Sequence, residues 1–348
     1  MLFKIISCII KLYERGFTMA KLDNFLIQLF HEGNCLEMYK VFGAHLEEND
    51  GDKGVRFSVY APHAKSVQVV GDFNNWNGEE HYMERYTDGG IFTLFIPHIK
   101  QYATYKYRIE TPNGSWVDRA DPYAFFSELR PATASKVYNI DGFKWADKRW
   151  LNKRTKNFDK VLNIYEANIG SWKMKKDFTD EEDGEYYSYE EMIDEIIPYV
   201  VENGFSHIEL MPLIEFPFDG SWGYQNTGFF APTKRYGTPD KLMKFVDMMH
   251  QAGIGVIMDF VPVHFAVDGY GLKLYDGTPL YEYDNKDTGE SEWGSCNFIH
   301  SRREVQCFLQ SAANYWLEEY HFDGIRMDAV SRLIYWQGDE SRGVNDTA

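Results

Sequence analysis

Hydrophobic and polar residues alternate with a period of two between residues 55 and 138. In the first run Val55, Phe57 and Val59 are separated by polar residues, and similar runs follow at 67–69, 92–96 and 105–109. Such alternation buries one face of a strand and exposes the other. Turn-forming residues separate the runs at 61–63, 74–78, 88–90 and 111–114. The pattern predicts an immunoglobulin-like antiparallel β-sandwich, which we bound at residues 50–140.

After residue 160 the pattern changes to strand, loop and helix. Residues 161–165 are a short apolar run, and Ser188 with Glu191 is a capping box that begins a helix. Gly204 ends this helix, and Pro198 inside it predicts a kink or local break. The residues expected on its buried stripe are Met192, Ile193, Ile196, Ile197, Val200 and Val201.

Three further strands are expected at 207–211, 255–260 and 324–328. The helix after the first of these has Thr238 as N-cap and Pro239 at its first position, and Gly253 follows its end. The next helix is expected to be capped by Ser301 with Glu304. Strands that alternate with helices indicate a parallel sheet with its chemistry at the carboxyl ends of the strands. The inward residues expected on the helix after Thr238 are Leu242, Phe245, Val246 and Met249.

A doubly wound sheet is the competing architecture for this half of the chain. It usually carries a glycine-rich phosphate turn after its first strand, but residues 166–172 contain neither GxGxxG nor GxxxxGK. We therefore expect residues 160–348 to form the first half of a (β/α)8 (TIM) barrel, with four β/α units. Residues 141–159 are expected to be a linker, 19–49 an N-terminal segment, and 1–18 an extension from a misassigned start codon.

Composition narrows the class of ligand. The 348 residues carry 36 Lys and Arg against 53 Asp and Glu, a formal charge of −17. A surface this acidic repels nucleic acid and anionic membranes, so a neutral partner fits better. Aromatic residues make up 17 % of the chain. Flat rings stack on the faces of sugars, although an aromatic-rich core explains the same excess.

The four cysteines, at positions 8, 35, 296 and 307, show no CxxC pair and no zinc-like spacing. Neither a disulfide framework nor a metal site is indicated, and we expect a reduced, cytoplasmic setting without metal or cofactor. The apolar stretch at residues 1–10 is too short to span a bilayer and shows no clear cleavage site for a signal peptide.

Three segments at strand ends hold the candidate chemistry. Asp259 closes the third expected strand and His264 follows in the loop; the alternative is a loop cap and a surface histidine. Arg326 and Asp328 lie two residues apart on the fourth expected strand, so their side chains point to the same side. They are either a nucleophile with its neighbouring cation or a structural ion pair. The loop 218–232 carries aromatic residues that could stack on a sugar ring or could equally anchor the loop. These residues are Trp222 and Tyr224.

In this order the three segments resemble the α-amylase superfamily of retaining glycoside hydrolases and transglycosidases. Within it, the resemblance is to the glycogen (1,4-α-glucan) branching enzymes, through YEANIGSW at 165–172, ELMP at 209–212, SWGYQ at 221–225 and DFVPVH at 259–264. VGDFNNW at 70–76 is similar to the starch-binding-type sandwich that precedes the barrel there. In the third-strand motif the family often has Trp at the position of Phe260 and Gly at that of Val263.

The resemblance implies a role for each matched residue. Asp328 would be the catalytic nucleophile and Arg326 its positioning cation. Asp259 and His264 would hold sugar hydroxyls, and Tyr224 would stack under that ring, with Trp222 and Gln225 also at the substrate. The implied partner is an α-glucan such as glycogen or an amylose-like chain. Cleaving an α-1,4 link and forming an α-1,6 branch with retention requires a covalent glycosyl-enzyme ester.

A retaining reaction also needs a second carboxyl, the general acid. In the family this Glu closes the fifth strand, which the sequence does not contain, because it ends twenty residues after Asp328. We therefore expect a C-terminally truncated chain that is inactive alone. Two alternatives stand: a non-catalytic glucan-binding fragment, and a debranching or trehalose-releasing hydrolase of the same superfamily, which segments 166–172 and 221–225 disfavour.

Overall fold

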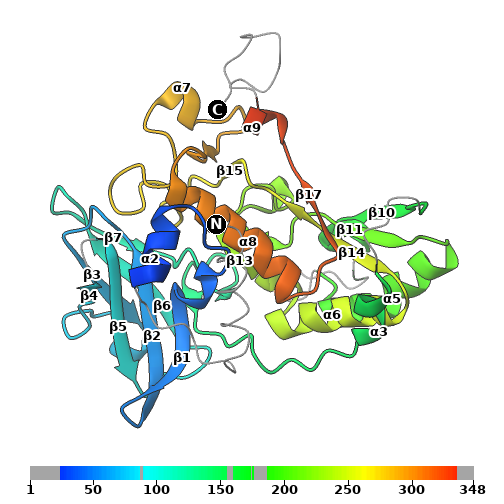
Figure 1. The fold of residues 1–348 in the computed structure, drawn as a ribbon, viewed down its shortest axis with the longest axis horizontal. Helices are drawn as coiled ribbons and strands as arrows, with labels where there is room; N and C mark the ends of the chain where they lie inside the picture. The colour runs from blue at the N-terminus through cyan, green and yellow to red at the C-terminus, as the bar shows by residue number, and fades with distance from the viewer. Residues whose placement is uncertain (1–23, 87–88, 155–159, 174, 176–185, 335–348) are drawn as a thin grey trace.

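A computed structural model describes residues 24–86, 89–154, 160–173, 175 and 186–334 (Figure 1). The expected N-terminal extension at 1–18 lies outside the described residues, as do 335–348. Among the described residues no helix is long and apolar enough to cross a membrane.

Two antiparallel sheets form the N-terminal part, as the period-two pattern predicts (Figure 1). One sheet has the order β1-β2-β5-β4 and the other β3-β6-β9-β8, with β7 paired to β6. Strand β1 was not predicted; it pairs along its whole length with β2 and begins before residue 50. The strands are β1 (Gly43–Asn49), β2 (Asp52–Tyr60), β3 (Ser66–Gly71), β4 (Glu84–Tyr86), β5 (Ile91–Pro97), β6 (Thr104–Glu110), β7 (Trp116–Arg119), β8 (Phe126–Ser127) and β9 (Ser135–Lys136).

Aromatic side chains fill much of the core, which accounts for a large part of the aromatic excess. Phe57 packs edge-on against Tyr105, whose ring in turn meets Tyr107. Both tyrosine hydroxyls donate to Asp121, at 2.7 and 3.1 Å. Burial raises the pKa of Asp121 to about 6, against the lowering effect of these hydrogen bonds.

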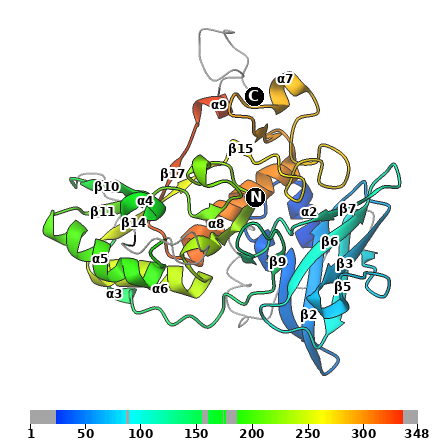
Figure 2. The same ribbon diagram turned by 180° about the vertical axis from the view of Figure 1, so that it is seen from behind.

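The C-terminal part contains a parallel sheet of order β10-β11-β14-β17, which confirms the expected strand–helix alternation (Figures 1 and 2). Because all four strands are parallel, their carboxyl ends meet at one edge. Its strands are β10 (Ile164–Ala167), β11 (His207–Leu210), β14 (Gly255–Phe260) and β17 (Gly324–Met327). The loops that follow β11 and β14 each contain a two-stranded antiparallel sheet. These are β12 (Ile214–Glu215) with β13 (Gly228–Pro232), and β15 (His264–Phe265) with β16 (Cys296–Asn297).

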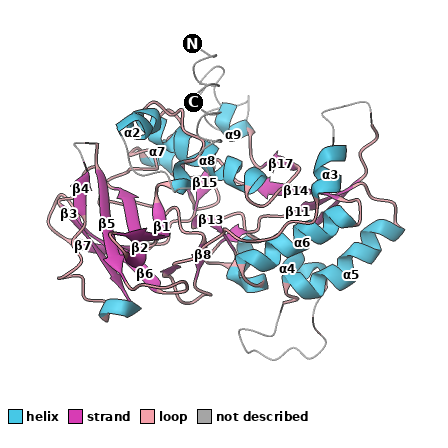
Figure 3. Ribbon diagram, turned by 60° about the horizontal axis from the view of Figure 1, so that its bottom comes forward, coloured by secondary structure: helices cyan, strands magenta, loops and turns pink. Residues whose placement is uncertain are grey.

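Helices α5 (Tyr189–Glu202) and α6 (Pro239–Gln251) lie side by side next to this sheet, while α8 (Arg303–Glu318) lies between the sheet and the sandwich (Figures 1 and 3). The remaining helices are short. They are α2 (Asn24–His31), α3 (Lys148–Lys153), α4 (Ile169–Trp172), α7 (Lys286–Gly289) and α9 (Ser331–Ile334), with 3₁₀ turns η1 (Met38–Lys40), η2 (Asp72–Asn74), η3 (Asp219–Ser221) and η4 (Lys234–Tyr236).

The start of the first parallel strand was predicted too early. β10 begins at Ile164, and the preceding Val161 and Leu162 are 91 % and 61 % exposed. An apolar run alone does not fix where pairing starts; here β10 pairs with β11 only from Ile164 opposite His207 onward. The backbone of Asn163 instead bonds Ser206.

Helix α5 begins as predicted, with Ser188 accepting from the Glu191 backbone and the Glu191 side chain reaching back. The helix is continuous through Pro198, so the expected break is absent. Val201, placed on the buried stripe from sequence, is 47 % exposed. Val201 therefore lies outside the buried face of α5, which packs mainly against α6.

Helix α6 follows the prediction, with its four expected inward residues fully buried. The cap of α8 does not: its N-cap is Arg302 and no side chain caps it. Glu304, the expected capping partner of Ser301, instead lies 2.8 Å from His31 Nδ1 of α2. A long-range contact has therefore replaced the local capping box.

The segment expected to be a linker contains helix α3 and is tied to the barrel strands. His250 of α6 is buried, and its two ring nitrogens each lie 2.9 Å from a carboxylate, of Asp147 and of Asp323. Trp150 stacks on the His250 ring and donates to Asp323 at 2.8 Å. These contacts fix residues 147–150 against the amino-terminal end of β17.

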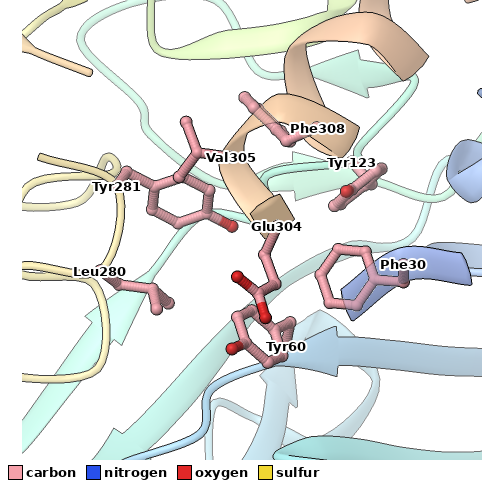
Figure 4. A pocket seen from close by; sticks show the side chains of 8 residues that line it. All are labelled: Phe30, Tyr60, Tyr123, Leu280, Tyr281, Glu304, Val305 and Phe308. Atoms are coloured by element: carbon pink, nitrogen blue, oxygen red, sulfur yellow. The ribbon is translucent and has the colours of Figure 1, made fainter. Parts of the chain in front are cut away.

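The sandwich packs against α8 and the loop that precedes it. Figure 4 shows a small pocket in this interface, where Tyr60 of β2 and Phe30 of α2 face Glu304 and Phe308 of α8. Tyr123 is stacked on Phe230 of β13 with ring centroids 4.8 Å apart. Buried aromatic contacts therefore join the two parts into one core.

Candidate functional site

Asp259 and Arg326 lie directly opposite each other at the carboxyl ends of adjacent parallel strands, β14 and β17. Arg326 Nη1 donates to both carboxylate oxygens of Asp259, at 2.9 and 3.0 Å. The Asp259 side chain is fully buried, whereas that of Arg326 is 42 % exposed. The strand register thus places a charged pair at the rim of the sheet.

Asp328 follows β17 and completes a three-residue charge cluster. The same Arg326 nitrogen lies 2.6 Å from Asp328 Oδ1, as expected for residues two apart on one strand face. The Asp328 backbone N–H donates to the Phe260 carbonyl at 2.9 Å, so its main chain is still paired to β14. Its side chain is 20 % exposed. One guanidinium therefore holds two carboxylates, one buried and one accessible.

The loop between β12 and β13 brings Tyr224 to this cluster. Its hydroxyl donates to Asp259 Oδ2 at 2.8 Å. Gln225 points elsewhere and donates to the Trp293 carbonyl at 3.0 Å. Trp222, with φ of 54°, is 60 % exposed. The three residues expected at the substrate lie on one short loop, but Tyr224 is the one that touches the carboxylates.

His264 is buried, 3 % exposed, which rules out the surface-histidine alternative. Its Nδ1 lies 2.9 Å from Ser295 Oγ, and the ring lies 5.2 Å from that of Trp293. Burial lowers the pKa of His264 to about 4, although the charge of Asp328 acts in the opposite direction. The imidazole is therefore neutral at pH 7 and able to exchange hydrogen bonds with a neutral hydroxyl.

Burial also raises the pKa of Asp259 to about 6, while hydrogen bonds from Tyr224 and Arg326 oppose this effect. At neutral pH the carboxylate is mostly ionised, and its oxygens already accept three hydrogen bonds from protein. Asp328 accepts from Arg326 with one of its oxygens. Chemically, the accessible Asp328 is the better placed of the two to act as a nucleophile.

An ion network centred on buried Arg235 holds the Tyr224 loop in position. Asp219 at the start of η3 accepts from Arg235, at 2.7 Å, and from Arg130 of the sandwich. Arg235 also pairs with buried Glu215 at 2.8 Å, and its guanidinium lies 3.8 Å from the centre of the Phe216 ring. The loop is therefore fixed from both the hairpin and the sandwich.

Sequence reasoning missed Ser295, Trp293 and Glu209. Ser295 and Trp293 come from the long loop after β15, whose composition gives no signal that it folds back on His264. Glu209 is opposite Glu166 on β10 and opposite Ile257 on β14, one inward-facing layer below Asp259. Burial and the charge of Glu166 raise the pKa of Glu209. The inward alternation of ELMP at 209–212 was the available signal for this residue.

Within the residues that the structure describes, no group of three or more His, Cys, Asp or Glu side chains is arranged to hold a metal ion.

Comparison with known families agrees with the two-part architecture. Residues 41–124 match carbohydrate-binding module 48 (isoamylase N-terminal domain), and residues 176–273 match the alpha amylase catalytic domain. Part of the second match, 176–185, lies outside the described residues.

Curated relatives are similar over most of this chain. A 1,4-alpha-glucan branching enzyme GlgB of Bacillus mycoides is 50 % identical over 322 residues, which are 92 % of this chain and 49 % of the relative. One of Bacillus cereus is 51 % identical with the same coverage. The chain thus spans about half the length of the curated relatives it matches. The resemblance to branching enzymes of the α-amylase superfamily is confirmed.

Solved structures share the fold. A putative alpha amylase from Salmonella typhimurium is 26 % identical with a TM-score of 0.65, over 87 % of this chain and 45 % of its own. A pullulanase from Paenibacillus barengoltzii in complex with maltotetraose is 19 % identical with a TM-score of 0.69, over 91 % of this chain and 51 % of its own. The predicted sandwich followed by part of a TIM barrel is confirmed.

Proposed function

We propose that this chain carries the donor-sugar half of the active site of a 1,4-α-glucan branching enzyme. Residues 50–140 would be its glucan-binding module, 141–159 the connecting segment, and 160–348 the first four β/α units of its catalytic barrel. The observation that carries this assignment is the cluster of Asp259, Arg326, Asp328 and Tyr224 at the carboxyl ends of β14 and β17. Similarity to the branching enzymes supports the choice of reaction.

In this proposal Asp328 attacks the anomeric carbon of an α-1,4-linked glucose, so that a glycosyl ester forms and the α-1,4 C–O bond breaks. The leaving 4-oxygen takes its proton from the general-acid carboxyl of the complete barrel. Arg326 pairs with Asp328 and aims its carboxylate, because the guanidinium is anchored on buried Asp259. A 6-hydroxyl of another glucan chain then attacks the anomeric carbon of the ester. Its proton passes to the same carboxyl, now acting as a base, the ester C–O bond breaks to release Asp328, and two inversions leave the anomeric configuration retained.

The remaining site residues hold the sugar. The neutral imidazole of His264 and the carboxylate of Asp259 would bind hydroxyls of the glucose ring at the cleavage point. Tyr224 would stack beneath that ring. Trp222 is exposed on the same loop and would contact a neighbouring glucose unit, with Gln225 fixing that loop to the Trp293 carbonyl. An acidic protein surface is compatible with this neutral polymer.

Trapping with a glycosyl fluoride tests the nucleophile. Fluoride leaves without a proton from a general acid, so 5-fluoro-α-D-glucosyl fluoride needs only a competent nucleophile and donor site. We expect a covalent adduct on the tryptic peptide 327–332, which contains Asp328, and none in Asp328→Asn. An adduct on another carboxylate, an equal adduct in Asp328→Asn, or no adduct at all would contradict the assignment.

A second function, glucan binding by the sandwich, is favoured by two exposed tryptophans on it. Trp76, at 39 % exposed, and Trp116, at 43 %, lie on either side of Arg108, which donates to the Trp76 carbonyl and pairs with Asp118. Exposed rings beside polar groups suit sugar stacking. Retardation in amylose-containing native gels measures the affinity of the chain for amylose. This affinity should fall about tenfold in Trp116→Ala, because one stacking ring is lost. Phe25→Ala, at a similarly exposed ring (51 %) on α2 and outside this sheet, is the control.

A further inference from the structure

The N-terminal segment 31–39 runs along one face of helix α8. His31 lies 2.8 Å from Glu304, and the backbone at Gly33 is so close that an added Cβ would lie 3.1 Å from the Arg303 carbonyl. Further along, the Tyr39 backbone N–H donates to Ser311 Oγ at 3.3 Å.

Tyr39 extends the contact by two more turns of the helix. Its ring packs edge-on against Tyr315 at 5.1 Å, and its hydroxyl donates to Glu319 at 2.7 Å. Ser311, Tyr315 and Glu319 follow one another at intervals of four residues, about one turn each. Cys307, four residues before Ser311, lies on the same face.

Cys35 is the residue of segment 31–39 that lies beside Cys307. The Cys307 thiol donates to the Cys35 carbonyl oxygen, with sulfur and oxygen 2.8 Å apart. Both thiols are free and buried, at 6 % and 0 % exposed, although Asn34 and Leu36 on either side of Cys35 are exposed. The segment thus reaches the surface at the point where the two cysteines meet, 272 positions apart in sequence.

The two thiols also differ in acidity. The contact between the two thiol groups lowers the pKa of Cys35 more than burial raises it, and the same side-chain contact, followed by burial, raises the pKa of Cys307. Cys35 is therefore the more acidic thiol of the pair, and an acidic thiol beside a second thiol is the arrangement that oxidises to a disulfide.

We propose that Cys35 and Cys307 form a disulfide bond when the folded chain meets a hydroperoxide, fastening segment 31–39 to α8. The Cys35 thiolate attacks a peroxide oxygen, the O–O bond breaks, and protonation releases water (or an alcohol) and leaves a sulfenic acid. Cys307 sulfur then attacks the Cys35 sulfur; the S–S bond forms, the S–O bond breaks, and the second water leaves with the Cys307 proton. The two electrons lost by the thiols reduce the peroxide.

Peptide mapping tests this pairing, because trypsin places each of the four cysteines on a separate peptide: 5–11, 22–40, 287–302 and 304–326. The native chain is treated with hydrogen peroxide, unfolded, alkylated and digested without reduction. We expect 22–40 joined to 304–326, restored to separate peptides by dithiothreitol, and an alkylated thiol at Cys296.

Matched variants separate this pair from general oxidation. Cys296→Ser removes another buried thiol and should leave the cross-link unchanged, whereas Cys307→Ser should abolish it and leave Cys35 as sulfenic or sulfinic acid. The wild-type map is decisive even where a variant folds poorly. Pairing of Cys35 with Cys8 or Cys296, over-oxidation of Cys35 without the cross-link, or two unreacted thiols would overturn the proposal.

Discussion

At the scale of single residues, burial sets the chemistry of the site. Asp259 and His264 carry opposite charge types, yet both have pKa values displaced toward their neutral forms because both are desolvated. Arg326 counteracts this effect at Asp259 and reaches Asp328 with the same nitrogen. The carboxyl-terminal rim of the sheet therefore holds the neutral imidazole of His264 and two carboxylates, Asp259 and Asp328, that are anchored by Arg326.

His264 should make stability depend on pH in a defined direction. Its pKa is about 4 in the folded chain and ordinarily 6.5, so the unfolded chain takes up a proton first as pH falls. The contribution of the neutral form is present above pH 6.5 and lost below it, about 3 kcal/mol at pH 4. Urea unfolding at pH 7 and pH 4 should therefore show a smaller difference in His264→Asn than in the wild type.

The control for this comparison is His98→Asn. His98 is exposed and has φ of 68°, a conformation that Asn tolerates. The same substitution there should leave the difference between the two pH values unchanged. A wild-type-like difference in His264→Asn would contradict the assignment of this proton uptake to His264.

At the scale of elements, helix starts show how local signals succeed or fail. Ser188 and Glu191 cap α5 as the sequence predicts, with Glu191 using its second carboxylate oxygen to pair with Lys175. Ser301 and Glu304 have the same spacing, but Glu304 is drawn to His31 of α2. Arg302, which bonds the carbonyls of Pro279 and Leu280, becomes the N-cap residue of α8 instead. A distant partner can therefore override a local capping motif.

The two serines give a matched test. Ser188→Ala should lower the free energy of unfolding by about 1 kcal/mol, because it removes the acceptor for the Glu191 backbone N–H. Ser301→Ala should change it by less than about 0.5 kcal/mol, because no side chain caps α8. Urea denaturation of both variants at pH 7 measures the difference; equal losses would contradict these capping assignments.

At the scale of the whole molecule, the sandwich and the parallel sheet are packed through α8 and share aromatic contacts such as Tyr123 with Phe230. The loop that carries Tyr224 is anchored to the sandwich through Arg130 and Asp219. The sandwich therefore supports the candidate site as well as offering its own exposed rings to a ligand.

The chain by itself should not branch amylose. Among the described carboxylates near Asp328, Asp259 is bound by Arg326 and Tyr224, and Glu209 lies one layer deeper in the sheet. Neither is free to give a proton to the leaving oxygen, and loss of general acid catalysis alone costs about 10²–10⁴-fold in rate. The iodine complex of amylose should remain unchanged over times at which a complete branching enzyme shifts it. A comparable shift would refute this expectation.

The sequence by itself determined the two-part architecture, since the hydrophobic period changes from two to strand–helix alternation near residue 160. It also placed Asp259, Arg326 and Asp328 at neighbouring strand ends, because parallel strands bring their carboxyl ends to one edge. It did not determine the strand β1, the start of β10 or the helix α3, whose positions depend on pairing partners distant in sequence.

Only the tertiary structure decided which side chains meet across long separations. The burial of His264 by Ser295 and Trp293, the tie of His250 to Asp147 and Asp323, and the approach of Cys35 to Cys307 leave no local pattern. Local periodicity encodes which face of an element is buried; the identity of the neighbour depends on how those faces pack, and packing sets desolvation and therefore the protonation of the site.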